Sequence, residues 1–191
     1  MPDRALKSNF QAGSSLLELV AVLALIAIIS AFSVPSLQSM LLSYRLNSAA
    51  RAMLVDFQFA LRIAQNSGTW VSLCISDDQK SCALAGDLYN WQRGWIIFKD
   101  PKANFSVESA NILKKRSGFD SSISHISGRN IKNAMRLSGT RRFGTTAGTG
   151  LPNGRMMFCS TSNKHQQIDL IVNIFGEARL EKQKILCQSI V

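Results

Sequence analysis

The chain has few of the residues from which enzymes usually build an active site. Among its 191 residues are two histidines, His125 and His165, which lie among Ser, Asn, Lys or Gln residues typical of loops. We therefore expect both histidines at the surface. The G-x-S-x-G motif of many hydrolases is absent, and residues 139–154, although rich in glycine, lack the G-x-x-x-x-G-K-[ST] spacing of a phosphate-binding loop. We expect no catalytic residue and interpret residues 139–154 as a mobile loop.

Cysteine is also scarce, and its spacing does not suit a metal ion. The four cysteines are Cys74, Cys82, Cys159 and Cys187, without a C-x-x-C pair. We expect neither a metal nor another cofactor, since zinc sites usually take closely spaced Cys or His ligands. Four cysteines allow three disulfide pairings. Cys74 and Cys82 flank a turn-like stretch, residues 77–80, so a local bridge is the simplest choice and leaves Cys159 for Cys187.

Acidic residues are outnumbered, and the excess of positive charge is uneven. The chain has 22 Lys and Arg but 12 Asp and Glu, a net charge of +10. Residues 1–101 carry 8 basic and 7 acidic residues, whereas residues 102–191 carry 14 and 5, which gives net charges of +1 and +9. A positive field favours polyanions such as nucleic acid or anionic lipid. A basic surface that serves only solubility is the alternative.

One region almost lacks polar side chains. The 19 residues from Leu16 to Val34 approach the roughly 20 that a transmembrane helix needs. Their one charged residue is Glu18. A carboxylate near the bilayer interior costs roughly 2.5–3.5 kcal/mol on insertion scales, which marks it as a functional candidate. An ordinary signal peptide, with Arg4 and Lys7 as its basic part, or a plain membrane anchor would explain the apolar run but not Glu18 after Gly13.

The order of Gly13, Glu18, the apolar run and Pro35 resembles the class III signal of type IV pilins and of type II secretion pseudopilins. The resemblance implies that a prepilin peptidase cuts after Gly13 and methylates the new N-terminus at Ser14, where the family usually has phenylalanine. It also implies that Glu18 engages the N-terminal amine of a neighbouring subunit. Pro35 would kink the helix, because proline removes a backbone hydrogen bond and clashes with the preceding turn.

The apolar spacing predicts that the helix continues to residue 68. Its apolar residues recur every three or four positions and form one stripe: Leu46, Ala50, Met53, Phe57, Leu61 and Ala64. Arg45, Arg51, Asp56 and Arg62 are expected on other faces. We predict a leader over 1–13, a helix over 14–68 with its transmembrane or filament-core part at 14–35 and its amphipathic part at 36–68, and a β-rich globular domain over 69–191.

Short apolar runs separated by turn residues predict the strands of that domain. The expected strands are 70–75, 94–98 within the run 91–99, 112–115, 131–137, 155–160, 168–175 and 178–182, with a hairpin turn at 174–179. A cysteine-bearing strand, the run Trp91–Asp100 and a late Phe158–Cys159 strand resemble minor pilins and pseudopilins of the FimT/GspH kind. The resemblance implies an α+β pilin-like fold, in which the long N-terminal helix packs on a C-terminal antiparallel β-sheet domain.

Some FimT-type minor pilins bind DNA through a Gly-Arg-x-Arg motif. The corresponding residues here are Gly176, Glu177, Ala178 and Arg179, so an acid replaces the first arginine and opposes phosphate binding. Other basic residues could compensate for the acid Glu177 if they lie on the same face as this turn. Lys132 and Arg136 are expected on the strand that precedes residues 139–154. The candidate DNA-binding residues are Arg141, Arg142, Arg155, Arg179, Lys182 and Lys184.

The sequence is thus interpreted as a minor type IV pilin of the FimT/FimU kind and not as an enzyme. Its expected partners are other major and minor pilins through the N-terminal helices, the prepilin peptidase, the inner membrane before assembly, and double-stranded DNA without sequence preference. The expected location is the bacterial inner membrane, with the C-terminal domain in the oxidising periplasm, and then the pilus at the cell surface. A GspH-like pseudopilin and a dedicated DNA receptor of the competence machinery are the alternatives.

Overall fold

The computed structural model describes residues 15–84, 90–139, 143–145, 153–160, 166–183 and 187, with only the backbone described for 32–36 and 143–145. Its elements are α1 (Leu16–Ser67), β1 (Val71–Ile75), η1 (Trp91–Arg93), β2 (Gly94–Lys99), η2 (Ser109–Asn111), β3 (Ile112–Ser117), β4 (Ile123–Ser127), β5 (Ala134–Leu137), β6 (Phe143–Thr145), β7 (Gly154–Ser160), β8 (Gln167–Val172) and β9 (Ala178–Gln183). The chain divides into two compact units, residues 1–40 and 41–191. The order of one long helix followed by strands confirms the predicted α+β class.

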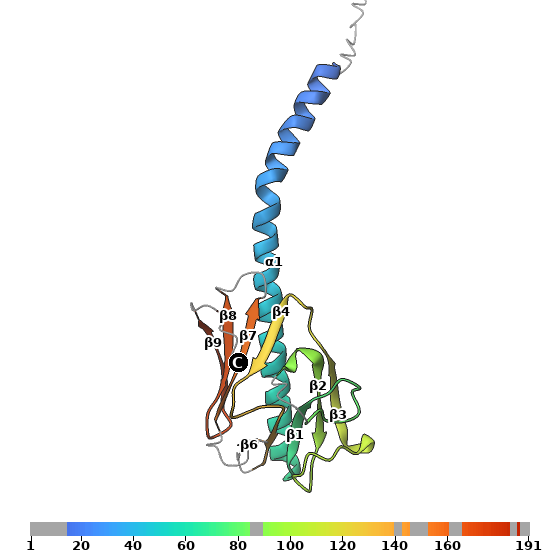
Figure 1. The fold of residues 1–191 in the computed structure, drawn as a ribbon, viewed down its shortest axis with the longest axis vertical. Coiled ribbons are helices and arrows are strands. Elements are labelled where there is room, and N and C mark those ends of the chain that lie inside the picture. Colours follow the sequence, from blue (N-terminus) through green and yellow to red (C-terminus); the bar gives the residue numbers. More distant parts are fainter. Residues whose placement is uncertain are drawn as a thin grey trace, which may run out of the picture. The chain divides into compact units, whose positions relative to one another are not determined.

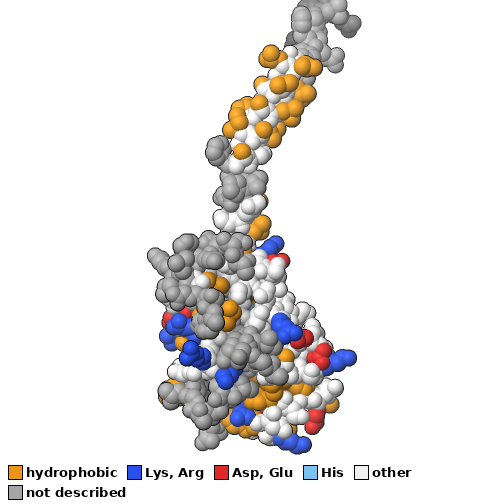
Figure 2. Space-filling view, viewed as in Figure 1, with side chains coloured by type: hydrophobic (Ala, Val, Ile, Leu, Met, Phe, Trp, Pro, Cys, Tyr) orange, Lys and Arg blue, Asp and Glu red, His pale blue; other side chains and the backbone are white. Residues whose placement is uncertain are grey.

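The described part of the first unit is the N-terminal part of α1. Ten large apolar side chains between Leu16 and Ile29 are 48–81% exposed. Figure 2 shows them in orange along this segment. Within the described residues, we find no helix whose length and apolar character would let it cross a membrane.

The second unit is built around the C-terminal part of α1. Its buried stripe includes Leu46, Ala50, Met53, Phe57 and Ala64. The burial of these residues confirms the predicted stripe at these positions. Burying such an apolar face against the rest of the protein is the main source of stability for an amphipathic helix. The helix ends at Ser67, next to the predicted stop. In Figure 1 the strands β1–β3 lie on one side of this part of α1 and the strands β7–β9 lie on the other side.

Two antiparallel sheets cover the helix. The first has the strand order β3-β2-β1-β5-β6 and the second the order β4-β7-β8-β9. All five β1 residues are buried, which suits a central strand covered on both faces. Gly94 begins β2 with φ 109°, and a Cβ there would lie 2.5 Å from the Arg116 backbone oxygen of β3. Glycine therefore permits the close pairing of β2 with β3.

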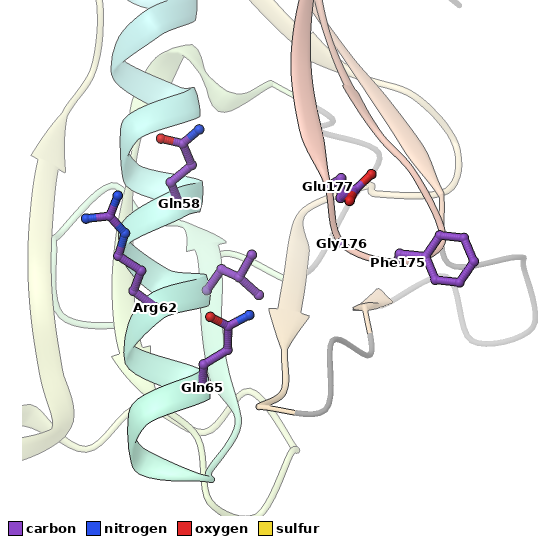
Figure 3. A pocket seen from close by; sticks show the side chains of 7 residues that line it. Gln58, Arg62, Gln65, Phe175, Gly176 and Glu177 are labelled. Atoms are coloured by element: carbon purple, nitrogen blue, oxygen red, sulfur yellow. The ribbon is translucent and has the colours of Figure 1, made fainter.

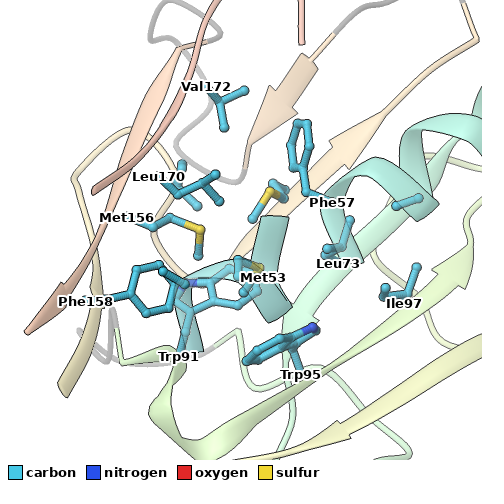
Figure 4. Packing of buried hydrophobic residues seen from close by; sticks show 14 of the residues in the cluster. Met53, Phe57, Leu73, Trp91, Trp95, Ile97, Met156, Phe158, Leu170 and Val172 are labelled. Atoms are coloured by element: carbon cyan, nitrogen blue, oxygen red, sulfur yellow. The ribbon is translucent and has the colours of Figure 1, made fainter. Parts of the chain in front are cut away.

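The main core lies between α1 and the inner faces of both sheets. Figure 4 shows Met53 and Phe57 of α1, Trp95 of β2, and Phe158 and Leu170 of the second sheet around one apolar interior. A smaller cluster on the outer face of the first sheet contains Cys74, Ile96, Phe98 and Ala134. The loop after β2 packs against this cluster through Phe105 and Val107.

Several strand predictions need correction. Strand β4 was not predicted, because its buried positions include the polar residues His125 and Ser127. The expected strand 131–137 begins at Ala134, and Lys132 lies in the preceding turn with φ 49° rather than on a strand. The predicted mobile loop 139–154 contains the strand β6 at residues 143–145, which pairs with β5. The remaining predicted strands agree with the structure to within a few residues at each end.

Candidate functional site

The N-terminal part of α1 carries the candidate assembly site. Backbone N–H groups of Glu18 and Leu19 donate to the Ser15 carbonyl at 2.9 and 3.2 Å, so Glu18 lies in the first helical turn. A carboxylate there interacts favourably with the positive end of the helix dipole. Glu18 is the single charged residue between positions 15 and 40. The predicted cleavage and methylation residues, Gly13 and Ser14, lie outside the described residues.

The exposed apolar side chains indicate what this segment contacts. A helix that is apolar on all sides is normally buried in a protein or a membrane. Contiguous apolar surfaces of this kind mark sites of contact with protein or lipid.

The backbone stays helical through Pro35. The kink expected there remains a prediction.

Two of the candidate DNA-binding residues lie together on the second sheet. Arg155 of β7 and Arg179 of β9 both pair in register with Ile171 of β8. Directly paired residues on neighbouring strands point to the same face, so both arginines share one face of the sheet. Their side chains are 54% and 65% exposed.

Each of these arginines has an acidic neighbour. Arg155 Nε lies 3.6 Å from Asp169 Oδ2, and Arg179 Nε donates to Glu181 Oε1 at 2.8 Å. Asp169 is fully buried, and burial raises the pKa of its carboxyl against the opposing effects of a hydrogen bond from Gln167 and the charge of Arg155. The described part of β7–β9 with its β8–β9 turn carries three basic and three acidic residues: Arg155, Arg179, Lys182, Asp169, Glu177 and Glu181.

The remaining candidates do not join this face. Lys182 follows Arg179 by three residues on β9 and therefore points to the opposite face, where it pairs in register with the buried Ile168. Arg141, Arg142 and Lys184 lie outside the described residues. The described chain thus brings together Arg155 and Arg179 but not Lys182.

The β8–β9 turn corresponds to the Gly-Arg-x-Arg position. Gly176 adopts φ 74° and its N–H donates to the Asn173 carbonyl at 3.0 Å. The Glu177 carboxylate accepts a hydrogen bond of 3.0 Å from the Asn173 side-chain amide. The hairpin predicted at 174–179 is confirmed, and an exposed carboxylate stands where the motif has arginine.

Both disulfide bonds join the cysteines that the sequence analysis paired. Cys74 of β1 bonds Cys82, and Cys159 of β7 bonds Cys187 across 28 residues. The second bridge fixes position 187 to the second sheet. Within the described residues, no group of His, Cys, Asp or Glu is arranged to hold a metal ion.

One buried ionic cluster corrects the predicted placement of Asp56. Its carboxylate is fully buried and accepts hydrogen bonds from Trp95 Nε1 at 3.0 Å and from Arg116 Nε and Nη2 at 2.5 and 3.0 Å. Lys114 Nζ lies 2.6 Å from Oδ1. Burial alone would raise the pKa of Asp56, but the hydrogen bonds and charges of Arg116 and Lys114 outweigh it and lower the pKa. Asp56 therefore joins α1 to β2 and β3.

The prediction of a surface location for His125 is wrong. His125 on β4 is fully buried, and neither ring nitrogen has a hydrogen-bond partner. Its ring stacks on Phe158 at 3.9 Å between centroids and meets Trp95 edge-on at 5.8 Å. Burial lowers the pKa of His125 well below 6.5, so the ring is neutral at pH 7. His165 lies outside the described residues.

Comparison with known proteins agrees with this architecture. Two crystal structures of the type IV minor pilin FimU from Pseudomonas aeruginosa are 18% identical to this chain, with TM-scores of 0.55 and 0.56. The similarity covers 76% of this chain and 99% and 95% of the FimU chains, and it shows a shared fold. The minor pseudopilin EpsH of the Vibrio cholerae type 2 secretion system is 8% identical at a TM-score of 0.49 and covers 72% of this chain and 97% of its own.

A comparison with curated protein sequences gives no match. The family model described as "Type II transport protein GspH" matches residues 49–176. This range is 128 of the 191 residues and includes α1 from residue 49 to its end and most of both sheets. The chain therefore belongs to the GspH family of minor pilins and pseudopilins.

Proposed function

We propose that the chain is a minor pilin that enters, or helps to initiate, a type IV pilus. The observation that carries the proposal is the N-terminal part of α1, where exposed apolar side chains surround a single carboxylate, Glu18. The fold that the chain shares with FimU, a type IV minor pilin, supports the same role. The chain would be structural rather than catalytic.

The proposed assembly begins in the inner membrane. The apolar run Leu16–Val34 supports insertion of the processed helix before assembly, with the globular unit in the periplasm. In the filament, apolar helices of other pilin subunits would cover the exposed side chains. Glu18 would pair with the N-terminal amine of a neighbouring subunit, since opposite charges attract strongly where water is excluded.

Processing at Gly13 tests this proposal. In cells with an active prepilin peptidase, the wild-type chain should lose its 13-residue leader and gain an N-methyl group at Ser14. The variant Gly13→Val should stay at full size, as measured by intact-mass spectrometry of membrane fractions. A wild-type chain that keeps its leader in such cells would contradict the proposal.

A GspH-like pseudopilin of a type II secretion system is the equally consistent alternative. It follows from the matching family model, whose description names type II transport. A deletion strain separates the two functions. Loss of surface pili with normal protein secretion supports the pilin, whereas loss of secretion with normal pili supports the pseudopilin.

Binding of double-stranded DNA is a second candidate function, either as part of the pilin role or as a dedicated DNA receptor. The net charge of +9 in residues 102–191 favours it, whereas Glu177 and the carboxylates near Arg155 and Arg179 oppose it. Neutralising phosphates would give an affinity that falls steeply with salt. Charge reversal at Arg141, Arg142 and Arg179 should weaken a gel shift of DNA by the purified chain, and an unchanged affinity would exclude these residues.

A further inference from the structure

The outward face of α1 in the second unit carries positive charge that no described residue neutralises. Arg51, Val55, Gln58 and Arg62 follow one another at intervals of four, three and four residues and are all exposed, so they form one stripe. Val55 is 54% exposed. Neither arginine of the stripe forms an ion pair with a described residue. The acid nearest to them on this helix, Asp56, is buried and bound to Arg116 and Lys114.

A hollow lies beside this stripe. It has a volume of about 290 Å³ and is lined by α1 on one side and by the β8–β9 turn on the other: Gln58, Leu61, Arg62, Gln65, Phe175, Gly176 and Glu177. Figure 3 shows Gln58 and Gln65 of α1 across from Glu177, with the Arg62 guanidinium pointing to the other side of the helix and the Phe175 ring turned away from the helix. The hollow therefore combines apolar and charged walls.

The turn presents a rigid apolar tip at the edge of the hollow. Ile174 and Phe175 are 45% and 62% exposed. The Asn173 side-chain oxygen accepts hydrogen bonds from the backbone N–H groups of Phe175 and Glu177 at 3.0 and 2.9 Å. These bonds fix the turn before any partner arrives, which lowers the entropy cost of binding. Exposed aromatic side chains of this kind commonly anchor protein interfaces.

We propose that Arg51, Val55, Gln58, Arg62 and Phe175, here called the α1–turn surface, dock a different, acidic subunit of the same filament. Carboxylates of that subunit would face Arg51 and Arg62, and an apolar side chain would enter the hollow beside Phe175. The inference rests on the proposed filament role and adds the class of partner and the surface that binds it.

Charge selects this occupant over a second copy of the chain. Two copies docked through this surface would bring arginines against arginines, and like charges across an interface strongly oppose binding. The net charge of +10 adds to that repulsion. Glu177 is the one acid that lines the hollow, and its carboxylate already accepts a hydrogen bond from Asn173. An acidic partner with an apolar side chain would neutralise Arg51 and Arg62 and would also cover the exposed Phe175.

Site-specific photo-crosslinking of the full chain in filament-producing cells tests the inference. A photoreactive residue at Gln58 should yield one dominant product with a different pilin-type subunit, joined at a peptide rich in Asp and Glu. The matched control position is Lys115, which is exposed on β3 on the face of the first sheet turned away from α1. The double variant Arg51→Glu/Arg62→Glu should lower the Gln58 product roughly tenfold, because like charges then meet. Replacing the partner's identified carboxylates by lysine should restore it.

Three results would overturn the inference: a Gln58 product that joins two copies of this chain or joins nucleic acid, a yield equal to that at Lys115, or a yield unchanged in the double variant. Sheared filaments from the same cells distinguish this failure from that of the proposed function. Normal filament content with one of these results contradicts the docking site alone. Absence of the chain from filaments together with absence of the product contradicts both proposals.

Discussion

Asp56 links the helix to the first sheet through Trp95, Arg116 and Lys114. It is fully buried, whereas the side chains of its partners Arg116 and Lys114 stay 29% and 36% exposed. Breaking a buried ion pair by removing one partner is costly, because it leaves uncompensated charge. Asp56 is thus a polar residue on a mainly apolar face of α1 that binds specific residues of β2 and β3.

We expect Asp56→Ala to lower the free energy of unfolding by about 3 kcal/mol, near the lower end for buried pairs because both cations keep contact with water. The lowered pKa of Asp56 has the same origin, so its stabilising contribution is present above pH 4 and is lost as the pH falls below that value. Denaturant titration followed by tryptophan fluorescence measures the change. Asp120→Asn, which removes an exposed contact with Arg45 at 3.8 Å, is the control and should change stability little. Equal effects of the two substitutions would contradict this role for Asp56.

His125 should make the stability of the globular unit depend on pH. The buried ring stays neutral while the same residue in the unfolded chain gains a proton below pH 6.5, so acid stabilises the unfolded state. The wild type should therefore lose stability more steeply than His125→Phe as the pH falls from 7.5 to 5, by at most about 1.4 kcal/mol per pH unit below 6.5. Parallel pH dependence of the two proteins would show that His125 does not titrate as inferred.

Single positions explain where sequence reasoning succeeded and where it did not. Glu18 could be singled out as a candidate from sequence because its signal is local, a charge inside an apolar run, and its role in assembly stays a prediction. The ion pairs of Asp56 could not be predicted, because its partner Arg116 lies 60 residues away in the sequence. Its position beside the apolar stripe could be predicted from its spacing to Met53 and Ala60. His125 was misplaced because its neighbours in sequence are polar, whereas its burial depends on four rings from three separate segments.

Among the helix and strands, predictability followed the strength of the periodic pattern. The amphipathic part of α1 and the apolar strands β1, β2 and β8 could be predicted from local sequence. The strand β4 could not, because polar residues occupy its buried positions, and β6 has three residues with a central glycine. The shared face of Arg155 and Arg179 also could not be predicted, since it depends on the register of three strands.

The two disulfide bonds should contribute unequally to stability. In the chain-entropy account, closing the 28-residue separation of Cys159 and Cys187 stabilises by roughly 3.5 kcal/mol, and closing the 8-residue separation of Cys74 and Cys82 by roughly 2.5 kcal/mol. The double variant Cys159→Ala/Cys187→Ala should therefore unfold at lower denaturant concentration than Cys74→Ala/Cys82→Ala. The reverse order would indicate that packing of Cys74 in the smaller core cluster outweighs loop closure.

The chain as a whole combines a globular unit, residues 41–191, with an N-terminal helix segment that carries exposed apolar side chains. The first unit has one charge among residues 15–40, while the second holds its charges in ion pairs and on exposed faces. This division suits a subunit that binds others through its helix and presents a separate surface for specific neighbours. In the proposed function, Glu18 and the surrounding apolar helix bring the chain into a pilin-type filament.

The most direct test compares the wild type with Glu18→Ala and the control Glu108→Ala in cells that produce filaments. Both variants should lose the 13-residue leader, because the cleavage site is intact. Quantitative mass spectrometry of sheared filaments should find Glu108→Ala at the wild-type amount and Glu18→Ala reduced roughly tenfold or more, since the charge pair in the water-excluded helix contact is lost. Glu18→Ala present in filaments at the wild-type amount would contradict the account.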